Sequence, residues 1–152
     1  MKALVFSDSH GAYKDMISAI EANPDTRLII FAGDMQRDID YVCEAYPNMP
    51  CAVVLGNNDF FTVNIPFDRL FEFSGKRIFL THGHNYTVKL SPRRLLAKAK
   101  KCGADICIFG HTHSRLIEKH DDIYLINPGP ASRYYAILEI NGDDIKITPK
   151  DV

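Results

Sequence analysis

Five short, continuous apolar runs constrain what this chain can fold into more than any other feature. They span residues 3–6, 28–31, 52–55, 78–80 and 106–109. Each run is uninterrupted rather than alternating, which is the pattern of strands that are buried on both faces. Helical patterns separate the first three runs, and strand–helix–strand connections predict a parallel sheet. The chain is therefore predicted to be an α/β protein.

Amphipathic spacing predicts the helices. Residues 13–20 and 39–46 carry apolar side chains three or four positions apart, as on one face of a helix. A third helix is predicted with Ser91 as its N-cap and Pro92 at its first helical position, ending near Gly103. The basic side chains on its other face are interpreted as a solvated surface, so no nucleic acid partner is indicated. They are Arg93, Arg94, Lys98, Lys100 and Lys101.

Beyond Gly110 the pattern changes to short alternating segments, which are typical of antiparallel strands. They span residues 114–117, 122–126, 134–140 and 144–147. Asn141-Gly142 joins the last two as a hairpin turn. The aromatic stretch over residues 60–75 is predicted to be a loop followed by a strand over 70–73. Its phenylalanines are interpreted as core or as a contact in a homo-oligomer, and they are Phe60, Phe61, Phe67, Phe71 and Phe73.

Composition bounds the class of protein. With 152 residues, 46% of them hydrophobic, the chain is predicted to form a single domain over residues 1–152. A net charge of -1 gives no general attraction to nucleic acids or anionic membranes. No apolar run approaches the roughly 20 residues of a membrane span, and no signal-peptide pattern is present, so a cytoplasmic location is expected. Four cysteines without a Cys-x-x-Cys pair predict neither a disulfide framework nor a thiolate zinc site.

Potential metal ligands follow every one of the five apolar runs. They are Asp8, His10, Asp34, Asn57, His82, His111 and His113. Because ligand sites of parallel α/β sheets lie outside the carboxyl ends of the strands, these side chains are expected to converge. Any single buried histidine is usually a hydrogen-bonded core residue, but four at strand ends favour a common site. Glycines would allow the sharp turns that this convergence needs, namely Gly33, Gly56, Gly83 and Gly110.

The ligand types indicate the metal chemistry. Imidazole, carboxylate and amide oxygen without thiolate suit Mn, Fe, Zn, Co or Ni rather than Ca. Seven ligands exceed one tetrahedral ion, whereas two ions about 3.5–4 Å apart, bridged by a shared carboxylate, would use them all. Asp34 is the natural bridge. Two divalent ions, two aspartates and a hydroxide leave a charge of about +1, which favours an anionic substrate.

Five ordered segments resemble the motif blocks of the calcineurin-like metallophosphoesterases. They are Asp8-Ser9-His10, Gly33-Asp34, Gly56-Asn57-Asn58-Asp59, Thr81-His82-Gly83-His84 and Gly110-His111-Thr112-His113. The short length and the Asn127-Pro128-Gly129 segment resemble the small bacterial and archaeal phosphodiesterase branch of that family. The resemblance extends from Lys2 to about Ile140. It implies two packed mixed β-sheets flanked by helices, a four-layer α/β/β/α sandwich in a single domain.

The resemblance also implies a binuclear metal centre. It assigns one metal to Asp8, His10, Asp34 and His113. It assigns the other to Asp34, Asn57, His82 and His111. The implied cofactors are two divalent ions, Mn first, with Ni, Zn, Fe or Co as alternatives. A metal-bridging hydroxide would then attack the phosphorus of a small phosphate ester, and the positions carried over as catalytic are Asn57, Asn58 and His82.

Asn58 departs from the family pattern. Many members have a histidine at this position that protonates the leaving oxygen, with the next residue, here Asp59, orienting it. Asparagine cannot act as a general acid. This loss should impair alkyl monoesters most, so a phosphodiesterase is favoured over a phosphomonoesterase or nucleotidase. Asn58 could still hydrogen-bond the leaving oxygen, and His84 or a metal-bound water could supply the proton.

A second class of function is a protein-interaction scaffold. The retromer scaffold subunit resembles this fold too, but metal-ligand positions of its blocks are altered. In this chain all seven positions are intact, which favours catalysis. Two arginines, Arg37 and Arg133, are placed where they could reach a substrate phosphate, although surface arginines without that role are commoner.

Overall fold

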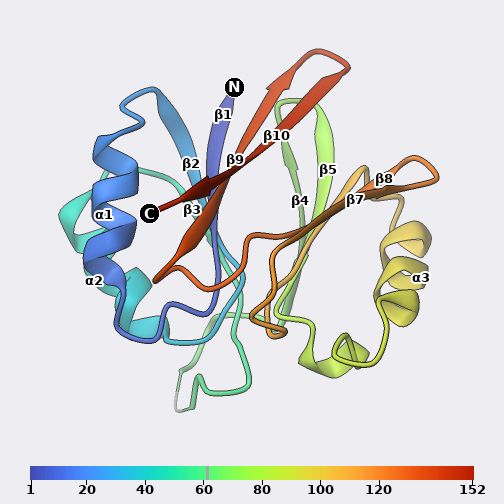
Figure 1. The fold of residues 1–152 in the computed structure, drawn as a ribbon, viewed down its shortest axis with the longest axis horizontal. Coiled ribbons are helices and arrows are strands. Elements are labelled where there is room, and N and C mark those ends of the chain that lie inside the picture. Colours follow the sequence, from blue (N-terminus) through green and yellow to red (C-terminus); the bar gives the residue numbers. More distant parts are fainter. Residues whose placement is uncertain (61) are drawn as a thin grey trace.

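Two mixed five-stranded sheets form the framework of this computed structural model, which describes residues 1–60 and 62–152 (Figure 1). The first sheet has the order β10-β9-β1-β2-β3. Its strands, in that order, span Asp144–Asp151, Tyr134–Asn141, Lys2–Phe6, Thr26–Phe31 and Cys51–Val53. The second sheet has the order β4-β5-β6-β8-β7. Its strands span Asp68–Phe73, Lys76–Thr81, Ile106–Ile108, Ile123–Asn127 and Leu116–His120.

The helices form the two outer layers. Helices α1 (Tyr13–Glu21) and α2 (Gln36–Ala45) cover the outer face of the first sheet, and α3 (Arg93–Lys101) covers the outer face of the second. The inner faces of both sheets share one core, to which Val5, Ile30 and Ile108 belong. Burying both faces of each sheet removes the most apolar surface from water, which explains the continuous apolar runs. The four-layer arrangement implied by the family resemblance is confirmed.

The strand directions show how the apolar runs divide between the sheets, and they correct one prediction made from the pattern. Strands β1, β2 and β3 are parallel as predicted, but the apolar runs of β5 and β6 belong to the second sheet. The five runs therefore do not form one open sheet. They lie in two sheets, and each sheet covers the inner face of the other. Strand β8 pairs antiparallel with β7 but parallel with β6, so it is not an ordinary hairpin strand. The β9–β10 hairpin across Asn141-Gly142 is confirmed.

Helix α3 begins one residue later than predicted. Pro92 occupies the N-cap with a ψ of 1°, and the backbone N–H of Arg93 donates to the Ser91 hydroxyl oxygen at 3.2 Å. Ser91 therefore accepts this hydrogen bond from the position before the N-cap and is not the N-cap itself. Two of the four free cysteines, which are eight positions apart in the sequence, have their sulfur atoms 3.1 Å apart: Cys43 on α2 and Cys51 on β3.

The aromatic segment divides between core and surface. Strand β4 confirms the strand predicted over residues 70–73, and Phe73 is buried in the core. Phe60 and Phe67 are 70% and 49% exposed, so of the two interpretations core burial does not hold for them, and a contact in a homo-oligomer stays a prediction. Phe61 lies outside the described residues. None of the helices described is long and apolar enough to cross a membrane.

Candidate metal centre

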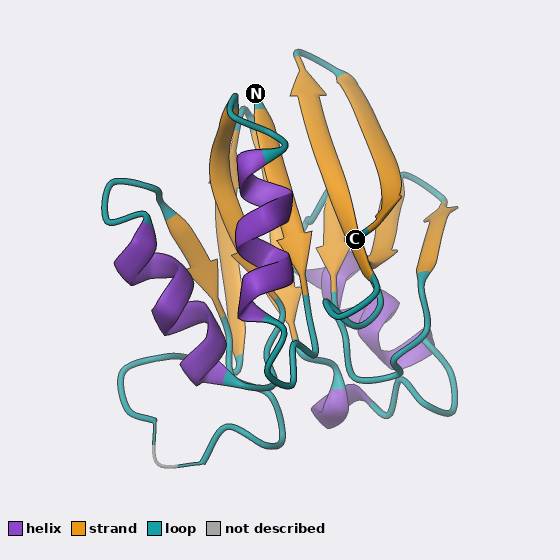
Figure 2. Ribbon diagram, turned by 60° about the vertical axis from the view of Figure 1, so that its left-hand side comes forward, coloured by secondary structure: helices purple, strands orange, loops and turns teal. Residues whose placement is uncertain are grey.

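Loops at the carboxyl ends of strands from both sheets meet at one end of the molecule, where Figure 2 shows them below the strands. Four of the predicted ligands converge there with donor atoms all within 4.8 Å of one another. They are Asp8, His10, Asp34 and His113. We call them the first donor group. Among the described histidines, cysteines, aspartates and glutamates, no other cluster of three or more has this spacing.

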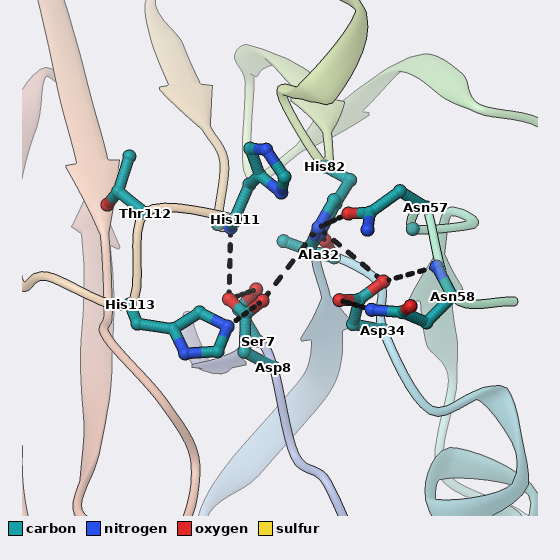
Figure 3. Close-up of polar contacts among 12 residues, drawn as sticks. Ser7, Asp8, Ala32, Asp34, Asn57, Asn58, His82, His111, Thr112 and His113 are labelled. Atoms are coloured by element: carbon teal, nitrogen blue, oxygen red, sulfur yellow. Dashed lines mark hydrogen bonds and ion pairs between the residues drawn. The ribbon is translucent and has the colours of Figure 1, made fainter. Parts of the chain in front are cut away.

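The remaining predicted ligands come from both sheets: Asn57 follows β3 of the first sheet, and His82 and His111 follow β5 and β6 of the second. We call Asp34, Asn57, His82 and His111 the second donor group. The Nε2 atom of His82 lies 3.0 Å from the Asn57 side-chain oxygen and 3.6 Å from a carboxylate oxygen of Asp34. The imidazole rings of His82 and His111 have centroids 5.1 Å apart. Figure 3 shows Asp8 and Asp34 between His113 on one side and Asn57 on the other.

Several ligand positions have an unusual backbone conformation. Five of the predicted ligands have positive φ: Asp8, His10, Asp34, His111 and His113. Non-glycine residues adopt this left-handed region infrequently, at a cost of about 1–3 kcal/mol each, and such residues cluster at functional sites. At the strand ends this conformation turns consecutive side chains back towards a common centre. The sequence carried a partial signal, because Asp and His tolerate positive φ better than most residues.

Two glycines make room for the carboxylates. A Cβ on Gly110 would lie 1.8 Å from the Ser7 hydroxyl and 2.6 Å from an oxygen of Asp8. A Cβ on Gly56 would lie 2.1 Å from an oxygen of Asp34. These glycines are therefore required for close approach rather than for a turn.

Asp8 is held so that one carboxylate oxygen has no hydrogen-bond partner among the described residues. The Ser7 hydroxyl and the His111 backbone N–H both donate to its Oδ2, at 2.7 and 3.0 Å. Its Oδ1 is buried and accepts no hydrogen bond from any described residue. Nε2 of His113 lies 3.2 Å from this oxygen, and Nε2 of His82 lies 3.8 Å from it. A buried, unpartnered carboxylate oxygen facing imidazoles is costly unless a cation binds it, so these residues fit a divalent metal.

His82 is oriented as a ligand by its surroundings. The ring is completely buried and its Nδ1 lies 2.7 Å from the backbone oxygen of Ala32. In a neutral ring Nδ1–H must donate to that acceptor, which leaves the Nε2 lone pair facing the site. Nε2 and the oxygen of Asn57 are then two acceptors at 3.0 Å. A cation bound by both atoms would satisfy this arrangement.

Asp34 is stabilised as a carboxylate. The backbone N–H and the side-chain amide of Asn58 donate to its two oxygens at 2.9 and 2.8 Å. Burial alone would raise the pKa of Asp34, but the hydrogen bonds from Asn58 and the nearby His82 outweigh this and lower it below its usual value. Asn58 thus supports the proposed bridging residue, and its amide hydrogen is directed at Asp34.

Asp59 anchors backbone rather than orienting a side chain. Its carboxylate accepts from the backbone N–H groups of Asp34, Met35, Gln36 and Gly56, at 2.7–2.9 Å. It joins the loop after β2, which leads into α2, to the loop after β3. The role that the family resemblance gives this position, orienting a histidine, is replaced here by holding together the segments that carry Asp34 and Asn57.

The partly buried histidines of the site favour their neutral forms. Burial, and then the proximity of His82 and Lys89, lowers the pKa of His111. Burial and His82 also lower the pKa of His84, whose Nδ1 is buried without a partner among the described residues. His84 lies next to His82, with ring centroids 5.5 Å apart, so it adjoins the centre as predicted. Neutral imidazoles are the form that binds metals.

Two buried polar residues that position the ligand loops were not predicted as site residues. Asp38 on α2 accepts from the Ser9 hydroxyl and the Gly11 backbone N–H, at 2.6 and 2.7 Å, and so holds the loop that carries His10. Asn127 donates to the Gly110 backbone oxygen at 3.0 Å. For Asn127 the sequence did carry a signal, the Asn127-Pro128-Gly129 segment of the family resemblance, but that signal did not indicate a role in holding the Gly110 loop.

His120, Arg37 and Arg133 lie outside the donor groups. His120 ends β7 and pairs with Glu118 at 2.7 Å. Arg37 lines a pocket of about 260 Å³ next to Asn58, and its Nε donates to the Tyr41 hydroxyl at 3.0 Å. Arg133 lines a larger pocket next to His113.

A protein-family model and a relative of known name both match most of this chain. Residues 1–143 match the model of the calcineurin-like phosphoesterase superfamily domain. The chain is 31% identical to Phosphodiesterase MJ0936 of Methanocaldococcus jannaschii over 88% of this chain and 86% of that protein.

Solved structures show the same fold. A predicted phosphoesterase from Streptococcus pneumoniae superposes with a TM-score of 0.84 at 26% identity, covering 99% of this chain and 88% of that one. Vps29 of Entamoeba histolytica, in its complex with Zn²⁺, superposes with a TM-score of 0.77 at 19% identity, covering 99% of both chains. At that identity the likeness to Vps29 extends to the fold alone.

Proposed function

Since the chain belongs to the calcineurin-like phosphoesterase superfamily, we propose that it is a metal-dependent phosphodiesterase with a binuclear centre. The observation that carries the proposal is the buried, unpartnered Oδ1 of Asp8 within a set of four donors that lie within 4.8 Å of one another. The first donor group would hold one ion and the second donor group the other, with Asp34 shared. Mn²⁺ is the first choice, with Ni²⁺, Zn²⁺, Fe²⁺ or Co²⁺ as alternatives.

Bound metal ions and the protein side chains around them would have different roles at the phosphate. Bound divalent ions supply Lewis acidity, which favours ionisation of water and stabilises the negative charge that develops on the phosphate. Asp34 keeps its charge because Asn58 donates two hydrogen bonds to it. Asn57 and His82 would bind the second ion, and His82 is held for this by Ala32.

The preference for diesters rests on Asn58. Asparagine cannot transfer a proton to a leaving oxygen, and one N–H of its side-chain amide is already donated to Asp34. An alkyl monoester, whose leaving group needs protonation, is disfavoured more than a diester with an activated leaving group. The 31% identity to a named phosphodiesterase supports the same choice.

The test compares bis(p-nitrophenyl) phosphate with p-nitrophenyl phosphate as substrates of metal-stripped protein, before and after addition of Mn²⁺ or Ni²⁺. We expect metal-dependent turnover, faster for the diester, that is lost in His111→Ala. Faster turnover of the monoester would contradict the diester preference.

A second candidate function is a protein-interaction scaffold, because the fold resembles that of Vps29. A scaffold needs no intact ligand set, whereas this chain retains all seven ligand residues. Stoichiometric metal binding without turnover of either ester would favour the scaffold over the enzyme.

A further inference from the structure

A pocket of about 510 Å³ adjoins the first donor group. Its lining residues are His113, Ser114, Arg115, Pro130, Arg133 and Tyr134. We call it the Arg133 pocket. Its volume falls in the range of about 300–1,000 Å³ that is typical of small-molecule sites. His113 belongs both to the proposed metal centre and to the pocket wall, so a phosphate ester bound at the metals would extend one of its substituents into this pocket.

The turn that carries Arg133 is attached to the backbone next to Asp8. The N–H of Ala131 donates to the backbone oxygen of Ser7 at 2.9 Å. The N–H groups of Arg133 and Tyr134 both donate to the backbone oxygen of Pro130 at 3.0 Å. The base of the Arg133 side chain is therefore fixed relative to the metal centre, although the side chain itself is exposed.

The two arginines of the pocket differ in what they contact. Arg115 is already engaged, because its Nη2 lies 2.7 Å from both Asp151 Oδ1 and the Lys150 backbone oxygen. Its guanidinium also lies 4.0 Å from the centroid of the Tyr134 ring. Arg133 forms no ion pair or side-chain hydrogen bond within residues 1–60 and 62–152. Its planar guanidinium is thus free to bind an oxyanion with two parallel hydrogen bonds.

The pocket on the opposite side of the centre has a different character. It lies next to Asn58 and also contains Arg37, Asp40 and the exposed ring of Phe60. A carboxylate accompanies the arginine there, and the arginine is bonded to Tyr41. That side therefore offers the exposed ring of Phe60, and an arginine whose Nε already donates to Tyr41 and which has a carboxylate, Asp40, in the same pocket wall. The two pockets therefore suit two different substituents of one phosphate diester.

We propose that the Arg133 pocket binds a second phosphate group, carried by the alcohol that stays on the phosphate after hydrolysis. The leaving alcohol then occupies the side of Asn58 and Phe60. This inference rests on the proposed phosphodiesterase activity and deepens it: the preferred substrates are diesters whose retained part is itself a phosphate ester, such as a nucleoside bisphosphate unit. Arg133 is the residue that determines this specificity.

The kinetic test uses p-nitrophenyl thymidine 5′-phosphate with and without a 3′-phosphate. In the Mn²⁺-loaded protein we expect KM to be about tenfold lower for the 3′-phosphorylated substrate, the size of one charged hydrogen-bonded contact. Arg133→Ala removes this difference by raising KM for that substrate alone, with kcat unchanged. Arg133→Lys retains part of it. Arg94→Ala, an exposed position on α3, serves as the matched control and retains all of it.

A binding measurement separates this inference from the proposed activity. Calorimetry compares thymidine 3′,5′-bisphosphate with thymidine 5′-phosphate, on the wild type and on Arg133→Ala. Tighter binding of the bisphosphate that disappears in the variant supports the pocket even if neither ester is hydrolysed, an outcome that would overturn only the phosphodiesterase activity. Hydrolysis of both esters with no preference, or an equal effect of Arg133→Ala on both ligands, would overturn the pocket and leave the activity standing.

Discussion

The two donor groups are built in different ways. In the first, all four residues have positive φ, and two of them, His10 and His113, are 41% and 51% exposed. In the second, His82 is completely buried and bonded to Ala32, and lies against Asn57. Backbone conformation brings the first group together, whereas a buried side-chain network positions the second. Only the first has all four donors within 4.8 Å among the described residues, so we expect it to bind its metal ion more tightly.

The largest effect is expected where the groups overlap. Asp34→Asn removes the negative charge shared by both groups, so both ions should bind weakly. Loss of a residue that only hydrogen-bonds to a metal ligand lowers metal affinity or activity by about 10–100-fold. Loss of the shared ligand itself should therefore reduce kcat/KM by more than about 100-fold. Metal analysis and diester turnover measure this, with the exposed Asp144→Asn as control. Full metal content in Asp34→Asn would contradict the bridging role.

A pair of histidine variants tests the contrast in construction. His82→Ala leaves a buried cavity and an unpartnered Ala32 oxygen, so it should lower the free energy of unfolding of the metal-free protein by about 2–4 kcal/mol. His10→Ala removes a partly exposed ring and should change that free energy by less than about 0.5 kcal/mol. Urea denaturation of both variants gives the comparison. Equal losses would show that the two groups are not built differently.

A smaller effect is expected at the Gly110 loop, which carries one residue of each donor group. Asn127→Ala frees the Gly110 loop, which carries His111 and His113, without removing a ligand. We expect metal affinity at both sites to fall by about 10-fold, the low end of the range for an outer partner. Titration with Mn²⁺ tests this. Weakening of one site alone would mean that Asn127 supports only one group.

The smallest effect concerns substrate preference. Asn58→His restores a proton donor next to Asp34 but loses the amide hydrogen bond to it. We expect turnover of an alkyl monoester such as glycerol 2-phosphate to rise by about tenfold relative to bis(p-nitrophenyl) phosphate, below the usual range for a general acid because of that loss. An unchanged ratio would remove the reason given for the diester preference.

The sequence predicted that the candidate ligands would converge, but the apolar runs alone did not predict how the strands divide between two sheets. Every apolar run is followed by a ligand type, so convergence at strand ends could be expected from Asp8, His82 and His111 without knowing which sheet each strand joins. The division into two sheets could not be read from the runs, because a strand buried between two layers looks the same in either sheet. Only the family resemblance supplied that arrangement.

Two further features of the site could not be predicted from the sequence: the backbone conformation of its loops and the buried residues that hydrogen-bond to them. Positive φ at Asp34 and His113 results from the loops as a whole, because single residues of these types only tolerate it. The roles of Asp38 and Asp59 depend on contacts across 23–29 positions of sequence, which no local pattern encodes. The sequence could name the candidate ligands but not the residues that hold them in place.

The central claim is that the two groups form two metal sites that share Asp34. Calorimetric titration of metal-stripped protein with Mn²⁺, on the wild type, His10→Ala and His111→Ala, tests it most directly. The account predicts two ions in the wild type, the tighter one lost in His10→Ala and the weaker one in His111→Ala. A single ion in the wild type, or loss of the same ion in both variants, would contradict it.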